Sequence, residues 1–163
     1  MAAKSKKKLV IGWFTFTCSE DNSILFVELL NTHFFEWKEK IEFRHCKLLK
    51  SDNILKDLDV AFIEGAISSE KDAEHLKEIR KNTKNLVTVG ACACTGMPAG
   101  QRNLFDKKLK EKIKHTLRAY ELNENVQPVK NFVKVDDEVP GCPMNEKIFL
   151  ETLDKYFKKF GVK

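Results

Sequence analysis

An apolar run that ends in a glycine and two cysteines sets the strongest limit on how this chain can fold. The run at 86–89 predicts a buried strand, because short continuous apolar segments of this kind fit the interior of a parallel sheet. Gly90 follows at once, and Cys92 and Cys94 come just past the tip of the strand. Ligands of open parallel sheets bind beyond the carboxyl ends of the strands. Soft thiol ligands beside glycines at this place predict the rim of a metal cluster.

Two other cysteines follow the same pattern. Cys18 ends the apolar stretch that begins at Trp13, and Cys142 lies in the rigid turn Pro140–Pro143 before a helix. The carboxyl ends of parallel strands meet at one edge of a sheet, so the three stretches together predict an iron–sulfur site at that edge. Cys46 lies within a predicted strand, and we expect it to be a core or edge thiol.

The composition fits one globular domain. The chain has 163 residues, of which 42% are hydrophobic and 33% are charged, so it can bury a core without disulfides. We expect residues 9–163 to form an iron–sulfur cluster-binding domain. Residues 1–8 are predicted to form a basic, disordered tail, which carries Lys4, Lys6, Lys7 and Lys8.

Several features favour a cytoplasmic protein. No apolar run approaches the ~20 residues of a membrane span, and the lysine-rich start is followed by no cleavage site. An odd number of cysteines, five, fits thiols or metal ligands in a reducing compartment. No aromatic residues are spaced for base stacking. We therefore expect neither membrane insertion nor a nucleic-acid partner.

Strand and helix patterns alternate along the chain. Strands are predicted at 9–16, 41–49, 60–63, 86–89 and 132–135, and helices through 24–30, at 69–81, at 107–118 and from Pro143 to about Phe160. This alternation predicts an α/β fold, a flavodoxin-like three-layer sandwich with a parallel sheet. The helix through 24–30 is apolar on more than one face. We expect it to expose apolar surface that a partner subunit covers.

Three blocks of sequence are similar to a known family. They are Trp13–Asp21, Glu64–Ile67 with Gly90–Gly96, and Pro140–Pro143. In order and spacing they resemble the small subunit of nickel–iron hydrogenases and the related 20 kDa subunit of NADH:quinone oxidoreductases. The resemblance implies one 4Fe–4S cluster beside a catalytic large subunit that holds the nickel–iron centre. It also implies electron transfer to a ferredoxin-like or flavin-bearing carrier during H2 oxidation or evolution. Longer members add a domain with more clusters, and this chain ends before such a domain.

The same resemblance assigns the site residues. Cys18, Cys92 and Cys142 match cluster ligands, while Ser19 stands where one branch of the family has a second cysteine. The fourth ligand stays open between the Cys94 thiolate, a Ser19 alkoxide and the Glu20 carboxylate, or the site is incomplete. Cys94 is equally well explained as a buried structural thiol. Other matching positions lie around the cluster: Glu20 is a candidate proton relay, and the cradle contains Glu64, Gly65, Thr95 and Gly96, with Arg102 and Asn103 shaping the loop.

Three further interpretations compete with a hydrogenase subunit. The first is a subunit of a quinone-oxidoreductase-like complex. The second is a structural subunit that has lost its cluster, which the serine at position 19 supports. The third is a flavodoxin-like flavin carrier, for which Thr15 and Thr17 offer hydroxyls after the first strand. Glu20 and Asp21 disfavour this last interpretation, because their charges would repel a phosphate.

Overall fold

A five-stranded parallel sheet forms the centre of the protein. The computed structural model describes residues 7–163, so Lys4 and Lys6 of the predicted tail lie outside the described residues. The strands are β1 (Leu9–Thr15), β2 (Ile41–Cys46), β3 (Leu58–Glu64), β4 (Thr83–Val89) and β5 (Asp137–Val139). Their order is β2-β1-β3-β4-β5, and every neighbouring pair is parallel. This is the flavodoxin-like order, as predicted.

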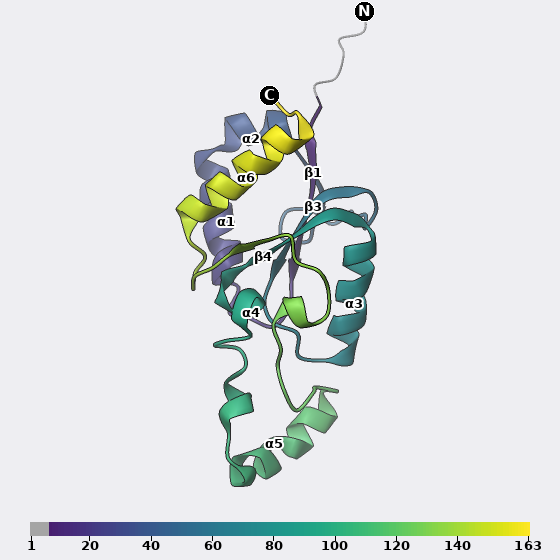
Figure 1. Ribbon diagram of the computed structural model, residues 1–163, viewed down its shortest axis with the longest axis vertical. Helices are drawn as coiled ribbons and strands as arrows, with labels where there is room; N and C mark the ends of the chain where they lie inside the picture. Colours follow the sequence, from purple (N-terminus) through teal and green to yellow (C-terminus); the bar gives the residue numbers. More distant parts are fainter. Residues whose placement is uncertain (1–6) are drawn as a thin grey trace, which may run out of the picture.

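Helices cover both faces of the sheet (Figure 1). One face packs against α1 (Asp21–Thr32), α2 (Phe34–Lys40) and α6 (Glu146–Phe160), and the other packs against α3 (Glu70–Lys81). The short helix α4 (Gly90–Thr95) follows β4 directly. The predicted three-layer sandwich is therefore confirmed. None of the helices in residues 7–163 has both the length and the apolar character that a membrane crossing requires.

One helix stands apart from the three layers. The helix α5 (Lys107–Ala119) lies beyond the end of the sandwich in Figure 1, and none of its residues is buried. It is preceded by the 3-10 helix η1 (Gln101–Leu104), and the chain returns to the sheet through a second 3-10 helix, η2 (Val129–Asn131). The 50-residue interval from Cys92 to Cys142 in the sequence thus contains a segment, from η1 through α5 to η2, that leaves the sheet and returns to it.

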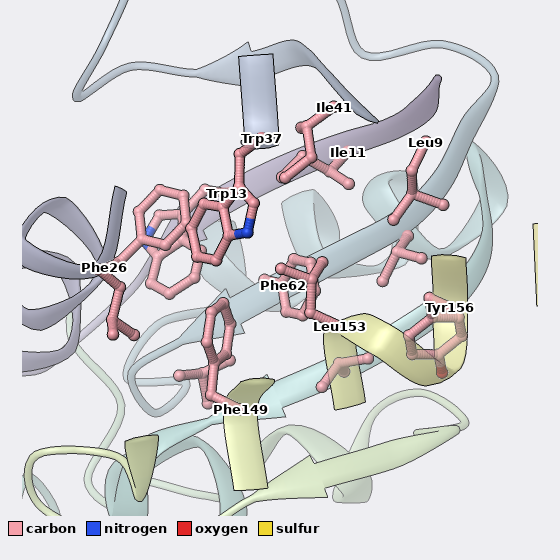
Figure 2. Packing of buried hydrophobic residues seen from close by; sticks show 14 of the residues in the cluster. Leu9, Ile11, Trp13, Phe26, Trp37, Ile41, Phe62, Phe149, Leu153 and Tyr156 are labelled. Carbon is pink, nitrogen blue, oxygen red and sulfur yellow. The ribbon is translucent and has the colours of Figure 1, made fainter. Parts of the chain in front are cut away.

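An aromatic cluster fills the core on the α1–α6 face (Figure 2). Trp13 of β1 stacks on Phe26 of α1 with ring centroids 4.3 Å apart, and Phe149 of α6 meets Phe62 of β3 at 5.5 Å. Such pairs are worth about 0.5–1.5 kcal/mol beyond their buried area. The cluster fixes β1 against α1, and this sets the course of the segment between them, which contains Cys18.

The fifth strand differs from its prediction. Residues 132–135 are not a strand; their apolar side chains pack against the cluster on the α3 face, and β5 begins at Asp137. The apolar residues of this segment are partly buried, but they do not pair with a neighbouring strand. The acidic residues Asp137 and Glu138 have poor intrinsic strand preference. They enter the sheet because Lys155 and Tyr156 of α6 bind the Asp137 carboxylate.

The helix through 24–30 also differs from expectation. Phe26 and Leu29 of α1 are buried, and Leu25 and Leu30 pack partly covered against the same cluster. Ile24 is the one large apolar residue of α1 that is exposed, at 60%. The helix therefore exposes less apolar surface than predicted: Ile24 is exposed, while Leu25 and Leu30 are partly covered. The helices α2 and α6 share its side of the sheet, and periodicity in one segment carries no information about them.

Candidate iron–sulfur site

Three cysteines lie just past the carboxyl ends of three strands. Cys18 follows β1, Cys92 lies in the first turn of α4 after β4, and Cys142 lies between β5 and α6. Glu64 ends β3, the strand between β1 and β4. Across the edge of the sheet the order is therefore Cys18, Glu64, Cys92, Cys142. The structure brings these four predicted residues to the same edge.

A buried carboxylate ties the segments together. Glu64 is fully buried and accepts hydrogen bonds from the backbone N–H (3.2 Å) and side-chain amide (3.0 Å) of Asn22. It also accepts from the Ser23 hydroxyl at 2.5 Å and from the Thr15 hydroxyl at 3.5 Å. The Asn22 side-chain oxygen accepts from the backbone N–H of Met144 at 2.7 Å. Glu64 and Asn22 thus join the start of α1 to the turn that carries Cys142.

Close backbone approach holds the other cysteine turns. The N–H of Ala91 donates to the carbonyl of Gly141 at 2.7 Å, which joins the turn of Cys92 to that of Cys142. Gly90 has a φ of +83°, and a Cβ at this position would lie 2.4 Å from the Asn22 amide nitrogen. Only glycine fits such a contact, so the predicted role of Gly90 in close approach has a structural basis.

The thiols of Cys18 and Cys92 share one environment, whereas Cys142 is exposed. Cys18 and Cys92 belong to a small apolar cluster with Ala66, Val126 and Ala99. Burial raises the pKa of Cys18 to about 12, and the negative charge of Glu64 contributes in the same direction. Burial also raises the pKa of Cys92, with smaller contributions from Cys142 and Glu64. Each thiol therefore responds to its neighbours across the sheet edge.

Cys94 lies elsewhere. It is 2% exposed, and its sulfur lies 3.4 Å from the Thr88 hydroxyl and 3.9 Å from the Val139 carbonyl oxygen. Burial raises its pKa, and the charges that act on it are those of Glu138 and Lys130. Within residues 7–163, its hydrogen-bond partners are Thr88 and Val139, and neither Cys18 nor Cys92 is among them. Cys94 packs between the ends of β4 and β5.

The remaining predicted residues surround the cysteines. Ser19 is exposed and donates from its hydroxyl to Asp21 at 2.9 Å. Glu20 is exposed, caps α1 with a left-handed φ of 64°, and donates its N–H to the Cys18 sulfur at 3.4 Å. Gly65 follows Glu64 with a φ of +90°. The Thr95 hydroxyl donates to the Ala91 carbonyl within α4.

Gly96 and the loop after it close this part of the chain. Gly96 ends α4 in the left-handed conformation. Asn103 exchanges two hydrogen bonds with the backbone of Val126, at 2.7 and 2.8 Å, and Arg102 donates to the Ser68 and Asn123 carbonyls. These contacts fit the loop-shaping role predicted for both side chains.

The arrangement does not suit a single metal ion. Within residues 7–163, no group of three or more His, Cys, Asp or Glu side chains lies close enough together to hold one. A single ion draws its ligands to one point, whereas a four-iron cluster takes one thiolate at each of several corners. Cys18, Cys92 and Cys142 lie on three separate turns at one edge of the sheet, which is compatible with a cluster that takes one thiolate from each turn.

The family is shown by comparison with known proteins. The sequence profile described as "NADH ubiquinone oxidoreductase, 20 Kd subunit" matches residues 21–156, most of the chain. The chain belongs to this 20 kDa subunit family. The predicted resemblance is therefore confirmed.

Several relatives of this 20 kDa family protein are hydrogenase subunits. One is the HoxS subunit delta of the NAD-reducing hydrogenase of Cupriavidus necator, 30% identical over 71% of this chain and 63% of the relative. Another is a subunit of the F420-non-reducing hydrogenase vhu of Methanocaldococcus jannaschii, 31% identical over 61% of this chain and 39% of the relative. A third is the sulfhydrogenase 2 subunit delta of Pyrococcus furiosus, 29% identical over 84% and 56%. The chain thus spans about 39–63% of the length of these relatives.

Solved structures support the fold of the 20 kDa family protein. It matches a chain of an NAD+-reducing [NiFe]-hydrogenase with a TM-score of 0.79, at 24% identity, over 93% of both chains. A chain of the Ni-Fe-Se hydrogenase from Desulfomicrobium baculatum matches with a TM-score of 0.63, at 18% identity, over 91% of this chain and 61% of that one. At this level of identity, the likeness concerns the fold.

Sequence reasoning missed the residues that support the site. Asn22 and Ser23 read as helix-start residues, but their side chains bind Glu64, which is 41–42 positions away. Trp13 packs in the core, and its indole N–H also donates to the Ser23 hydroxyl at 3.0 Å. One signal was available. A carboxylate at the end of a continuously apolar strand is buried and needs donors, and Asn and Ser at a helix start can supply them.

Proposed function

We propose that this chain is the electron-transfer subunit of a nickel–iron hydrogenase complex and holds one 4Fe–4S cluster through Cys18, Cys92 and Cys142. One observation carries the proposal: three thiols and the buried Glu64 carboxylate gather at the carboxyl ends of four neighbouring strands. Clusters of this kind are held by cysteine thiolates. The hydrogenase part of the proposal rests on the names of the relatives from C. necator and P. furiosus.

For the fourth ligand we favour Ser19 or Glu20 over Cys94. Ser19 and Glu20 directly follow Cys18, and both side chains are exposed. The Cys94 sulfur lies beside Thr88 and Val139 at the ends of β4 and β5, and neither Cys18 nor Cys92 is among the groups that shift its pKa. An oxygen ligand is harder than a thiolate and binds iron more weakly. This corner of the cluster would be the most labile.

When bound, the cluster supplies one-electron transfer. The chain's own residues hold it and set its environment. The N–H of Glu20 stabilises negative charge on the Cys18 sulfur, whereas the Glu64 carboxylate opposes it. Ala66 and Val126 keep water from the inner side of the site, and Glu20 is a candidate to move protons at its rim.

In this role, the subunit connects a nickel–iron centre in a separate large subunit to a ferredoxin-like or flavin-bearing carrier. We place the complex in the cytoplasm and expect its reaction to be H2 oxidation or evolution. Alone, the chain would turn over no hydrogen.

A second function is favoured by one residue. Ser19 replaces a cysteine of one branch of the family and binds Asp21, which supports a structural subunit without a cluster. Membership in the 20 kDa family also leaves a subunit of a quinone-oxidoreductase-like complex as a third candidate.

The test is iron and acid-labile sulfide per chain, with EPR after reduction, on protein purified without oxygen. About four irons and four sulfides are expected. About three irons would indicate an open corner, as a weak oxygen ligand predicts. No iron, in protein reconstituted beside its large subunit, would contradict the electron-transfer function and favour the structural one.

A further inference from the structure

The net charge of the chain is concentrated on α5. Of the 29 Lys and Arg and the 24 Asp and Glu in the sequence, α5 holds six and one, which leaves 23 of each sign elsewhere. The net charge of +5 therefore equals that of this one helix. The cations are Lys107, Lys108, Lys110, Lys112, Lys114 and Arg118. Such a field attracts an acidic partner and orients its approach.

Most of these charges have no carboxylate partner in the part of the chain that the structure describes. Among residues 7–163, Lys114 is the one cation of α5 within 4.0 Å of a carboxylate, that of Glu111 at 3.3 Å. By contrast, the helix α3 buries Ala73, Leu76 and Ile79 against the sheet, while α5 buries no residue. The helix is amphipathic, and on its apolar side Ile113 and Leu117 are half-buried while Leu109 is exposed.

A groove runs along the apolar side of α5. Its floor contains Ile113 and Leu117 of the helix and Leu122 of the segment that follows, and it has a volume of about 170 Å³. Lys110, Lys114 and Arg118 also line it, together with the carboxylates of Glu111 and Glu124. The three cations outnumber the two carboxylates, and because they are spaced four residues apart they form one row along the helix. A groove of this size suits one or two apolar side chains, with the row of cations beside them.

The groove is held in shape at both ends. Asp106 caps α5 by accepting from the N–H of Leu109 at 2.8 Å, and the N–H of Leu122 donates to the Leu117 carbonyl at 2.8 Å. Where the chain enters and leaves this region, Arg102 and Asn103 of η1 bind the backbone of residues 123–126, which follow α5. A preformed surface loses little conformational entropy on binding.

We propose that the groove of α5 is a docking site for an acidic protein segment that inserts an aliphatic or aromatic anchor side chain between Ile113, Leu117 and Leu122. Carboxylates beside the anchor pair with Lys110, Lys114 and Arg118. Leu104, Leu109 and Tyr120 beside the groove are exposed, so a lipid surface is the competing occupant that the vesicle experiment below distinguishes. A protein segment is favoured because Ile113, Leu117 and Leu122 line a recess that a single side chain can fill. A nucleic acid would use the cations and leave the recess unfilled. The proposal stands on α5 and is independent of the metal site.

The first test is binding of a synthetic helical peptide of glutamate and alanine with two leucines one turn apart. A peptide with serines in place of the leucines is the control ligand. We expect Leu117→Ser, and separately a Lys110→Gln/Lys114→Gln/Arg118→Gln variant, to weaken binding of the leucine peptide about tenfold. Lys147→Gln, on the exposed surface of α6, should leave binding unchanged. Circular dichroism verifies that each variant keeps its helices.

Two results would overturn the proposal. One is equal binding of the leucine and serine peptides. The other is no peptide binding together with binding to phosphatidylcholine–phosphatidylglycerol vesicles or to a DNA duplex. In cells, a photoreactive benzoylphenylalanine at Leu122 should crosslink to a segment with net negative charge and an apolar residue. No crosslink, or one to a basic segment, would also contradict it.

Discussion

Two cysteines that are two residues apart have different surroundings. Cys92 shares an apolar cluster with Cys18, while Cys94 packs against Thr88 and Val139. We therefore expect Cys92→Ala to lower the iron content severalfold and Cys94→Ala to leave it near that of the unmodified protein. Cys46→Ala is the matched control, since Cys46 is also buried but lies in β2, three strands away from β4. Loss of iron in the Cys94 variant, with its stability unchanged, would make Cys94 a ligand.

Glu64 gives the site its shape through four hydrogen bonds. In Glu64→Gln, an amide NH2 replaces one acceptor oxygen and leaves buried donors of Asn22 or Ser23 unsatisfied. We expect the free energy of unfolding to fall by about 1–3 kcal/mol in urea titrations of the iron-free chain. Glu138→Gln, on the exposed side of β5, should change it by at most about 0.5 kcal/mol. A Glu64 variant as stable as the original would mean that desolvation of the carboxylate offsets its hydrogen bonds.

At the scale of elements, the turn from β4 into α4 depends on a glycine. Gly90 and Gly161 both have positive φ, +83° and +66°, but a Cβ on Gly161 would meet no atom within 4 Å. We expect Gly161→Ala to destabilise by about 1–2 kcal/mol, the strain of the backbone alone. Gly90→Ala adds the clash with Asn22, so we expect it to lower the free energy of unfolding by clearly more than Gly161→Ala and to reduce the iron content. Equal effects in thermal unfolding would show that Asn22 moves aside freely.

The hydrogen bonds between Asp137 of β5 and two residues of α6 predict that the stability of the protein depends on pH. Burial tends to raise the pKa of Asp137, but hydrogen bonds from Lys155 and Tyr156 outweigh it and hold the pKa below its ordinary value. A lowered folded pKa adds stability above the unfolded pKa, about 3.9, and that stability is lost as pH falls through the folded pKa. We expect Asp137→Asn to be about 1–2 kcal/mol less stable near neutral pH, with the difference shrinking below about pH 4.

Asp154→Asn is the control for that measurement, because Asp154 is 57% exposed and pairs only with Lys158 one turn away. Its stability should follow that of the unmodified protein at every pH. If the difference in free energy of unfolding between Asp137→Asn and the unmodified protein persisted at low pH, packing of the side chain, and not its charge, would stabilise β5.

Local pattern predicted most elements but not their long-range contacts. The predicted segments 60–63 and 86–89 lie within the central strands β3 and β4, and the predicted helix at 69–81 is α3, which Ser69 caps by accepting from the Asp72 N–H. The three-residue strand β5 has no period to detect, and its pairing depends on α6. Cys18, Cys92 and Cys142 could be found because each follows a strand or lies in a turn. The burial of Cys94 and the link from Asn22 to Glu64 required the folded chain.

At the scale of the whole molecule, the core and the cysteine edge are separate. The two large apolar clusters, one on each face of the sheet, contain none of Cys18, Cys92 or Cys142. The cluster on the α1–α6 face contains the stacked rings of Trp13 and Phe26, and neither ring is a candidate ligand. The fold should therefore form without a cluster, in contrast to small domains whose metal supplies most of their folding free energy.

Removal of iron with a chelator under reducing conditions tests this separation. We expect the far-ultraviolet circular dichroism to persist and the midpoint of thermal unfolding to fall, because a group that binds only the folded state stabilises it. Hydrogen exchange should accelerate in residues 17–22, 90–96 and 140–144, while the central strands β1 and β3 stay protected. Complete loss of helix signal on iron removal would contradict the prediction. It would mean that the sheet edge, and not the aromatic core, holds the layers together.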